Sequence, residues 1–162
     1  MSLNDEIDFN MIVSDIIKKD RFMRLQNEVH HGTNRLAHSL RVAKTTYKWS
    51  KKLKLQNYEE VTRAALLHDY FLDSELSGHV EIFYHPQLAL QNAINDYKIN
   101  YIQKDIITSH MFPVGNKIPK YKESWLVSLA DKYCSLQEFA KYKISFTTGT
   151  LAIYIINLLM FQ

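Results

Sequence analysis

The chain has 162 residues, with 20 Lys and Arg against 17 Asp and Glu, seven His and a single Cys. This length fits one domain and is too short for two ordinary domains with a linker. The 46% hydrophobic content, with only four Gly and three Pro, excludes disordered, collagenous and low-complexity classes. The lone Cys134 excludes an internal disulfide and metal sites of three or four thiolates within the chain, whereas imidazole and carboxylate sites remain open. We therefore expect one domain over residues 1–162, in a reducing compartment.

Charge and hydropathy predict a cytoplasmic protein. The net charge of +3 is modest, and neither a nucleic acid nor a membrane is the expected partner. The first ten residues are acidic and lack the basic and apolar regions of a signal peptide. The most apolar stretch, Leu151 to Phe161, contains Asn157 and is too short to cross about 30 Å of hydrocarbon as a helix. We expect a core or interface helix there, which could join two copies of the chain.

Apolar residues at spacings of three and four predict three helices in the first half of the chain. The first runs from Asp8 to about Gln26, and the second from Asn34 to about Leu53. The third opens at Asn57, with Glu60 three residues later as a capping-box variant, and ends at His68 and Asp69.

The second half of the chain predicts four more helices after an irregular loop. Pro86 is expected at the first position of the fourth helix, with His85 near its N-cap. The fifth runs from about Tyr101 to His110. A sixth follows residues 120–124, and a last one follows Gly149. The expected fold is all-α, with about seven helices.

Six polar residues share one property: each is a hard or borderline metal ligand at the end, or against the apolar side, of a predicted helix. They are His38, His68, Asp69, His85, His110 and Asp131. Asp69 follows an apolar run, where burial of a carboxylate costs free energy unless it is paired or bound to a cation. Neighbours on a helix point about 100° apart, so His68 and Asp69 can reach a common ion most easily at a helix end. The pattern predicts a divalent-metal site built from several helices.

These residues resemble the signature of the HD-domain metal-dependent phosphohydrolases. The resemblance reads AHSLRVA around His38, AALLHDYF around His68 and Asp69, and SLADKYC around Asp131. It covers residues 33–142, about two-thirds of the chain. It implies a helical bundle, which agrees with the helices predicted from periodicity.

Two further histidines resemble the binuclear branch of this superfamily, which includes bacterial diadenosine tetraphosphate hydrolases and HD-GYP cyclic-dinucleotide phosphodiesterases. They are His85 in YHPQLAL and His110 in SHMFP. The GYP-type motif is absent, and Gly115 lies in VGNKIPK instead. The resemblance therefore implies a small nucleotide or related phosphoester as substrate rather than a cyclic dinucleotide.

The resemblance also implies two divalent ions, with Asp69 bridging them. One ion would be held by His38, His68, Asp69 and Asp131, and the second by His85 and His110. A hydroxide held by the ions would attack the phosphoester while their charge neutralises the phosphoryl oxygens. Imidazole and carboxylate suit Fe, Mn, Co, Ni, Zn and Mg, and the family precedent favours Fe or Mn.

Three cations are candidates for contact with the substrate, and each has the alternative of an exposed helix cation. Lys132 could bind a phosphate or act as an acid toward the leaving oxygen, and Arg41 and Lys122 could bind phosphate. The remaining three histidines have no predicted role: the pair His30 and His31 is expected at a helix end and His79 in a loop.

Two other functions stay open. Some HD-fold proteins with a di-iron site are oxygenases, and the ligand set alone does not separate oxygen activation from hydrolysis. A catalytically silent HD module for signalling or protein interaction is the other alternative, although such modules usually lose ligands and the set here is complete.

Overall fold

The computed structural model describes residues 2–30, 33–76 and 81–160, and for residues 30, 81–82 and 144–160 it describes the backbone only. The elements in chain order are α1 (Leu3–Ile17), α2 (Asp20–Arg24), β1 (Val29–His30), β2 (Thr33–Asn34), α3 (Arg35–Lys52), α4 (Tyr58–Leu66), α5 (Glu81–Asp96), α6 (Tyr101–Ser109) and α7 (Lys122–Met160), with single 3-10 turns at Leu25–Asn27 and Asp73–Glu75. The all-α prediction is confirmed, because the described strands amount to one hairpin of two residues per strand.

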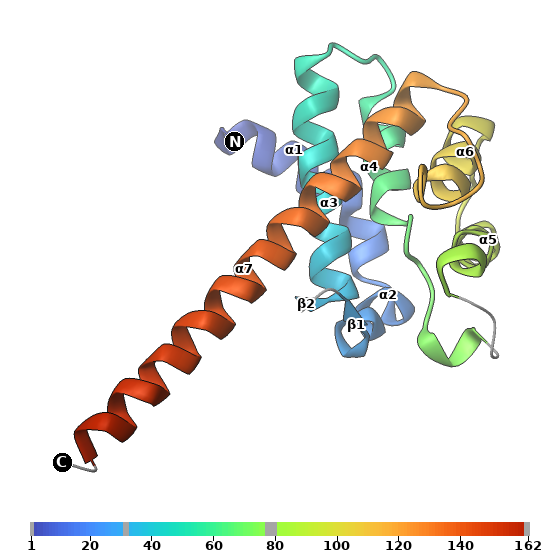
Figure 1. Cartoon of the computed structure of the whole chain (residues 1–162). Coiled ribbons are helices and arrows are strands. Elements are labelled where there is room, and N and C mark those ends of the chain that lie inside the picture. The colour runs from blue at the N-terminus through green and yellow to red at the C-terminus, as the bar shows by residue number, and fades with distance from the viewer. Residues whose placement is uncertain (1, 31–32, 77–80, 161–162) are drawn as a thin grey trace.

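Helices α3, α4 and α7 form the centre of the molecule. Figure 1 shows the first half of α7 crossing α3 and α4, with α5 and α6 on one side, while the second half of α7 projects away from the body. The side chains at the meeting of these three helices are small and fully buried, among them Ala43, Ala64, Ala65, Val127 and Ala130. Small side chains let helix axes approach closely, so polar residues on facing helices can come within contact distance.

The first predicted helix is wrong in extent, because the structure divides it into α1, α2 and a 3-10 turn. Lys19 is extended, with ψ of 129°, and separates the two helices. On a continuous helix Phe22 would lie roughly 120° and Leu25 roughly 180° around the axis from Ile16, so neither would share the face that Ile16 buries. The break turns Phe22 and Leu25 inward, and both are at most 1% exposed.

The second and third predicted helices are confirmed, but one of the two predicted caps is not. Asn34 caps α3, since its side chain accepts a hydrogen bond from the Ala37 amide at 2.8 Å. Asn57 makes no such bond to α4. Its side-chain Nδ2 donates instead to Glu123 Oε1 at 3.2 Å. The predicted capping box is therefore absent, and Asn57 links the start of α4 to α7.

Two further boundaries differ from prediction. Helix α5 begins at Glu81, so Pro86 lies inside it and His85 is a helical residue rather than a neighbour of the N-cap. A proline this close to the start removes one backbone hydrogen bond and does not end the helix. Helix α7 continues through Gly149, so the predicted sixth and seventh helices are one, because a single glycine costs a helix only about 1 kcal/mol.

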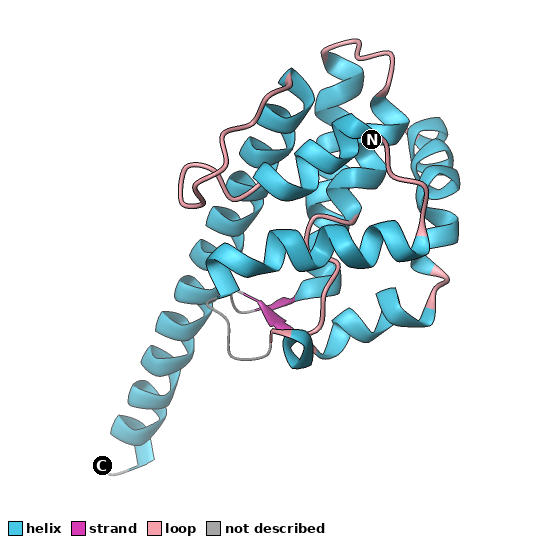
Figure 2. Cartoon of the chain, turned by 90° about the vertical axis from the view of Figure 1, so that its right-hand side faces the viewer, coloured by secondary structure: helices cyan, strands magenta, loops and turns pink. Residues whose placement is uncertain are grey.

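The hairpin of β1 and β2 lies beside the start of α3, as Figure 2 shows. Val29 pairs with Asn34 and His30 with Thr33. His30 is therefore in a strand and not at a helix end, whereas His31 and His79 lie outside the described residues.

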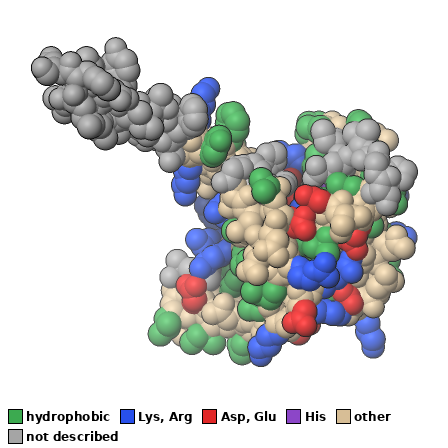
Figure 3. Space-filling model, turned by 90° about the horizontal axis from the view of Figure 1, so that it is seen from below, with side chains coloured by type: hydrophobic (Ala, Val, Ile, Leu, Met, Phe, Trp, Pro, Cys, Tyr) green, Lys and Arg blue, Asp and Glu red, His purple; other side chains and the backbone are tan. Residues whose placement is uncertain are grey.

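The surface on the face in Figure 3 mixes Lys and Arg with Asp and Glu and with scattered hydrophobic side chains, as the small net charge predicts. Over the part of the chain that the structure describes, no helix combines the length and apolar content that crossing a bilayer requires. The side chains of residues 151–160 are not described, so the dimer interface predicted there stays a prediction.

Candidate metal centre

Six polar side chains from five helical elements meet inside the bundle. His38 lies in the second turn of α3, and His68 and Asp69 lie in the turn that follows α4. His85 comes from α5, His110 is the C-cap of α6, and Asp131 comes from α7. All six are buried, with exposures of 6% or less. Burying two carboxylates among apolar helices is costly without compensating partners.

Half of this cluster is formed by α3, α4 and α7. His38 Nε2 lies 3.1 Å from Asp131 Oδ1, and His68 Nε2 lies 3.8 Å from the same oxygen. One nitrogen or oxygen from each of these three side chains falls within 4.8 Å of the others. Three ligand atoms this close together are placed to hold one cation.

Asp69 connects this half to the other. Its Oδ2 lies 3.4 Å from His68 Nε2. Its Oδ1 lies 3.3 Å from His85 Nε2 and 3.4 Å from His110 Nε2. The two oxygens of one carboxylate thus face two different sets of imidazoles, and His68, Asp69 and His110 form a second group of ligand atoms within 4.8 Å.

Local hydrogen bonds orient two of the imidazoles. His68 Nδ1 donates to the Ala65 carbonyl and His110 Nδ1 to the Ile107 carbonyl, both at 2.8 Å. A carbonyl only accepts, so Nδ1 carries a hydrogen, and in the neutral ring the lone pair of Nε2 points into the cluster. Metal-binding histidines are held in this way, with the second ring nitrogen donating to a fixed acceptor.

His68 provides the test of whether a cation fits. Its burial lowers the pKa to about 4, so the ring is neutral at physiological pH. Its buried Nε2 makes no hydrogen bond within the described residues, although a carboxylate oxygen of Asp69 lies 3.4 Å away. A lone pair facing a carboxylate at this distance is unfavourable by itself, and a divalent cation between them removes the conflict. The donor set therefore fits a metal ion.

The carboxylates of the cluster are ionised. Burial acts to raise their pKa values, but the charge that His68 gains in acid, together with hydrogen bonds that protonated His110 and His85 donate, holds the pKa of Asp69 well below its usual range. His38 and His68 do the same to the pKa of Asp131. Two buried carboxylates that keep their charge are the ligands a divalent ion requires.

The ring of His38 is held from both sides. Nδ1 lies 3.0 and 3.1 Å from the two carboxylate oxygens of Glu138, a residue that the sequence reasoning missed. Burial acts to lower the pKa of His38, but hydrogen bonds to Asp131 and Glu138 outweigh it and raise that pKa to about 10. A metal ion at Nε2 would displace the proton found there. Glu138 lies seven residues after Asp131, two helical turns along the same face, and this spacing is the signal that could have found it.

The three predicted substrate-contacting cations are placed differently. Lys132 is 34% exposed, lies 3.1 Å from Asp131 Oδ2 and also donates to the His110 carbonyl. Arg41 donates to Glu138 Oε1. Lys122 is exposed at the start of α7, nine residues or about 13 Å along the helix axis from Asp131. The structure therefore brings Lys132 and Arg41 to the cluster and leaves Lys122 away from it.

A buried arginine supports the His85 side of the cluster. The Phe71 ring stacks on His85 with the ring centres 5.2 Å apart, and the Arg35 guanidinium lies 3.9 Å from the centre of the same Phe71 ring. Arg35 also donates to the Phe71 carbonyl at 3.2 Å and to Asp73 at 2.8 Å. This arginine, 1% exposed, therefore fixes the loop that follows Asp69.

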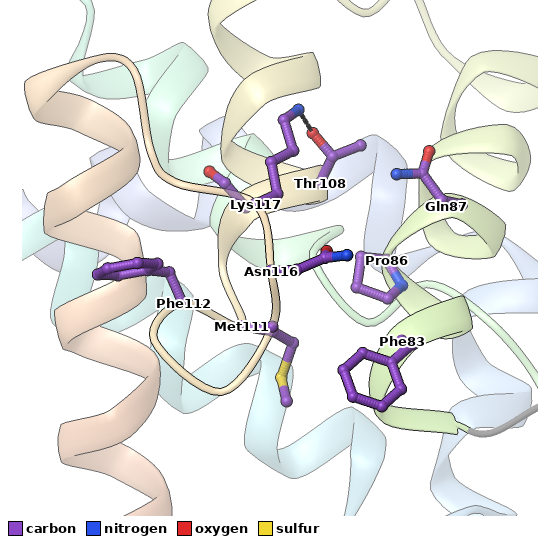
Figure 4. A pocket seen from close by; sticks show the side chains of 10 residues that line it. Phe83, Pro86, Gln87, Thr108, Met111, Phe112, Asn116 and Lys117 are labelled. Atoms are coloured by element: carbon purple, nitrogen blue, oxygen red, sulfur yellow. Dashed lines mark hydrogen bonds between the residues drawn. The ribbon is translucent and has the colours of Figure 1, made fainter.

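A small hollow lies beside the cluster, between α5 and the loop after α6. Figure 4 shows Phe83 and Met111 at one end and Thr108 and Lys117 at the other, with Lys117 donating to Thr108. Lining residues Pro86 and Ser109 adjoin His85 and His110 in the chain. Lys117 also lies 3.4 Å from buried Asp105, so its charge is already balanced.

Comparison with known proteins agrees with the geometry. The model of the HD domain family matches residues 35–136, well over half of the chain. The match includes all six residues of the cluster and stops two residues before Glu138. No curated protein and no solved structure matches the chain.

Proposed function

The chain belongs to the HD-domain family, and from this premise we propose that it is a phosphohydrolase that uses two divalent ions to cleave a nucleotide or related small phosphoester. Metal-dependent hydrolysis is the activity that the family suggests. The number of ions and the substrate class are our extension of it.

The observation that carries the proposal is the position of Asp69. Its oxygens face His68 on one side and His85 and His110 on the other, at 3.3 to 3.4 Å. A carboxylate with one oxygen toward each of two imidazole sets is suited to bridge two cations. Paired cations suit displacement at phosphorus, where both the attacking and the leaving oxygens carry negative charge.

Each residue then has a role that follows from its contacts. His38, His68 and Asp131 would hold one ion, and His85 and His110 the other, with Asp69 shared. Ions bound there would supply an activated water and neutralise charge on the phosphoryl oxygens. Lys132 is a partly exposed cation beside Asp131, and its ammonium group would bind a phosphate oxygen or give a proton to the leaving group.

Elemental analysis followed by assays on the same sample tests this proposal. The protein is purified without chelator, its metal content is measured, and hydrolysis of p-nitrophenyl phosphate, bis-p-nitrophenyl phosphate and a set of nucleotides is followed with Mn²⁺ or with Fe²⁺ under anaerobic conditions. We expect about two ions per chain and hydrolysis that EDTA removes and Mn²⁺ restores. One ion per chain would contradict the binuclear part, and oxygen consumption without hydrolysis would favour the oxygenase alternative.

A further inference from the structure

Glu138 is a buried carboxylate outside the six-residue cluster and beyond the family match. It lies on α7 and is 5% exposed. Both of its oxygens lie within 3.1 Å of His38 Nδ1, the ring nitrogen that faces away from Asp131. Its contact with His38 joins residues 100 positions apart in the chain.

The three imidazoles with a described Nδ1 contact are held in two ways. His68 and His110 lie just after the ends of α4 and α6, and each donates to a carbonyl three residues earlier. The last four carbonyls of a helix have no partner within the helix, so these acceptors are available. His38 lies inside α3, where the preceding backbone carbonyls already accept hydrogen bonds from amides of the same helix. Its Nδ1 therefore needs an acceptor from another element, and Glu138 is that acceptor.

Arg41 provides a second contact to the Glu138 carboxylate. It lies three residues after His38, nearly one turn along α3, and donates to Glu138 Oε1. Glu138 is thus fixed between two side chains of α3. A carboxylate constrained in this way can impose one orientation on the imidazole, which a freely rotating acceptor cannot do.

We propose that Glu138, held by Arg41, is a positioning residue that fixes the His38 ring with Nε2 directed at Asp131, and so sets the affinity of the site formed by His38, His68 and Asp131 for its cation. This inference rests on the proposed function of the cluster as a metal centre. It adds a residue that lies outside the family match and outside the ligand set.

The alternative is a purely structural ion pair between α3 and α7. It would make Glu138 important for stability but not for the affinity of one ion in particular. The two roles separate when binding is measured at each half of the cluster, because Glu138 contacts His38, which belongs to the half formed with His68 and Asp131.

Titration with Co²⁺ of the metal-stripped full chain tests the inference, with d–d absorption and calorimetry as readouts. The variants are Glu138→Ala, which removes the acceptor, and Glu138→Gln, which keeps an acceptor oxygen and the size. We expect Glu138→Ala to weaken one of the two binding events about 10- to 100-fold and to change its absorption spectrum, while the other event is unchanged. Glu138→Gln should recover most of this affinity. The neighbouring exposed Gln137→Ala is the matched control.

Thermal melting of the metal-free variants checks that they fold. If Glu138→Ala does not fold, Arg41→Met provides the test of the positioning role. The Arg41 side chain is 36% exposed, and its loss removes one of the contacts that hold the Glu138 carboxylate while keeping the carboxylate itself. We expect it to weaken the same event several-fold. Unchanged Co²⁺ affinity in the folded variants overturns the positioning role. Absence of Co²⁺ binding to the wild-type chain would instead overturn the proposed metal centre, so the two failures are distinguishable.

Discussion

His85 Nε2 and His110 Nε2 lie 3.0 Å apart, although α5 and α6 bring them from positions 25 residues apart. His110 carries its hydrogen on Nδ1, which donates to the Ile107 carbonyl. In the neutral form of this ring Nε2 is an acceptor, and His85 then supplies the hydrogen between the two nitrogens. The same two atoms flank Asp69 Oδ1, so this corner of the cluster is suited to a cation.

Loss of one of these imidazoles should remove one ion and leave the other. We expect His85→Ala to lower the bound metal from about two ions per chain to about one, because His38, His68 and Asp131 are untouched. Elemental analysis after dialysis against Mn²⁺ measures this directly. Gln87→Ala, an exposed change on the same helix, is the control and should keep both ions. Equal metal content in His85→Ala and the wild type would argue against a second site.

Asp69 faces both halves of the cluster, so its loss should affect both ions. We expect Asp69→Asn to reduce Mn²⁺-dependent hydrolysis more than about 100-fold, since an amide is neutral and a poor bridging ligand. Initial rates on the best substrate of the screen measure the effect. Glu59→Gln, an exposed change on α4 with the same change in charge, should retain wild-type rates. Retention of most activity in Asp69→Asn would exclude the proposed mechanism.

Lys132 should affect catalysis more than metal binding. We expect Lys132→Met to lower kcat by about 10-fold or more, in line with the loss of a positioned acid or phosphate contact, with the metal content unchanged. Lys141→Met, exposed and nine residues later on α7, is the matched control. A variant with normal kcat would assign Lys132 to the structural contacts it makes with Asp131 and the His110 carbonyl.

Arg35 should matter for stability. We expect Arg35→Met to lower the free energy of unfolding by about 2 kcal/mol, because it removes charged hydrogen bonds to the Phe71 carbonyl and to Asp73. Urea unfolding followed by circular dichroism measures the difference. The exposed Arg24→Met should change stability little. A loss no larger than that of Arg24→Met would show that the buried guanidinium contributes little net stability.

Asp5 should give the first helix a pH-dependent contribution to stability. Hydrogen bonds from Ser2 and Lys51 lower the pKa of Asp5 to about 2. A lowered pKa means that the contribution is fully present above pH 3.8, the ordinary value, and is lost as the pH falls toward 2. We expect Asp5→Asn to melt at a lower temperature than the wild type at pH 7, with the gap closing near pH 2. Ser2→Ala should shrink the dependence, and a gap independent of pH would contradict this assignment.

Most of the helices and the order of the candidate ligands could be predicted from the amino-acid sequence. Apolar spacing and breakers are local signals, so they placed the ends of α3, α4 and α6 within about three residues. They also placed His68, Asp69 and His110 at helix ends, where carbonyls are available to orient the imidazoles. Local signals were less reliable at Pro86 and Gly149, because a helix tolerates one such residue when the rest of the segment supports it.

Which atoms face one another depends on how the helices pack, and the sequence does not predict it. The contacts of Glu138 with His38 and Arg41 depend on how α7 crosses α3. A spacing of seven residues after Asp131 places Glu138 on the same face of α7 as Asp131, but it does not predict which residue of α3 Glu138 contacts. The same crossing puts Lys132 against the cluster and Lys122 about 13 Å further along the axis. Periodicity states which face of each helix is buried, whereas the distance between two buried polar atoms on different helices is set by how those helices pack.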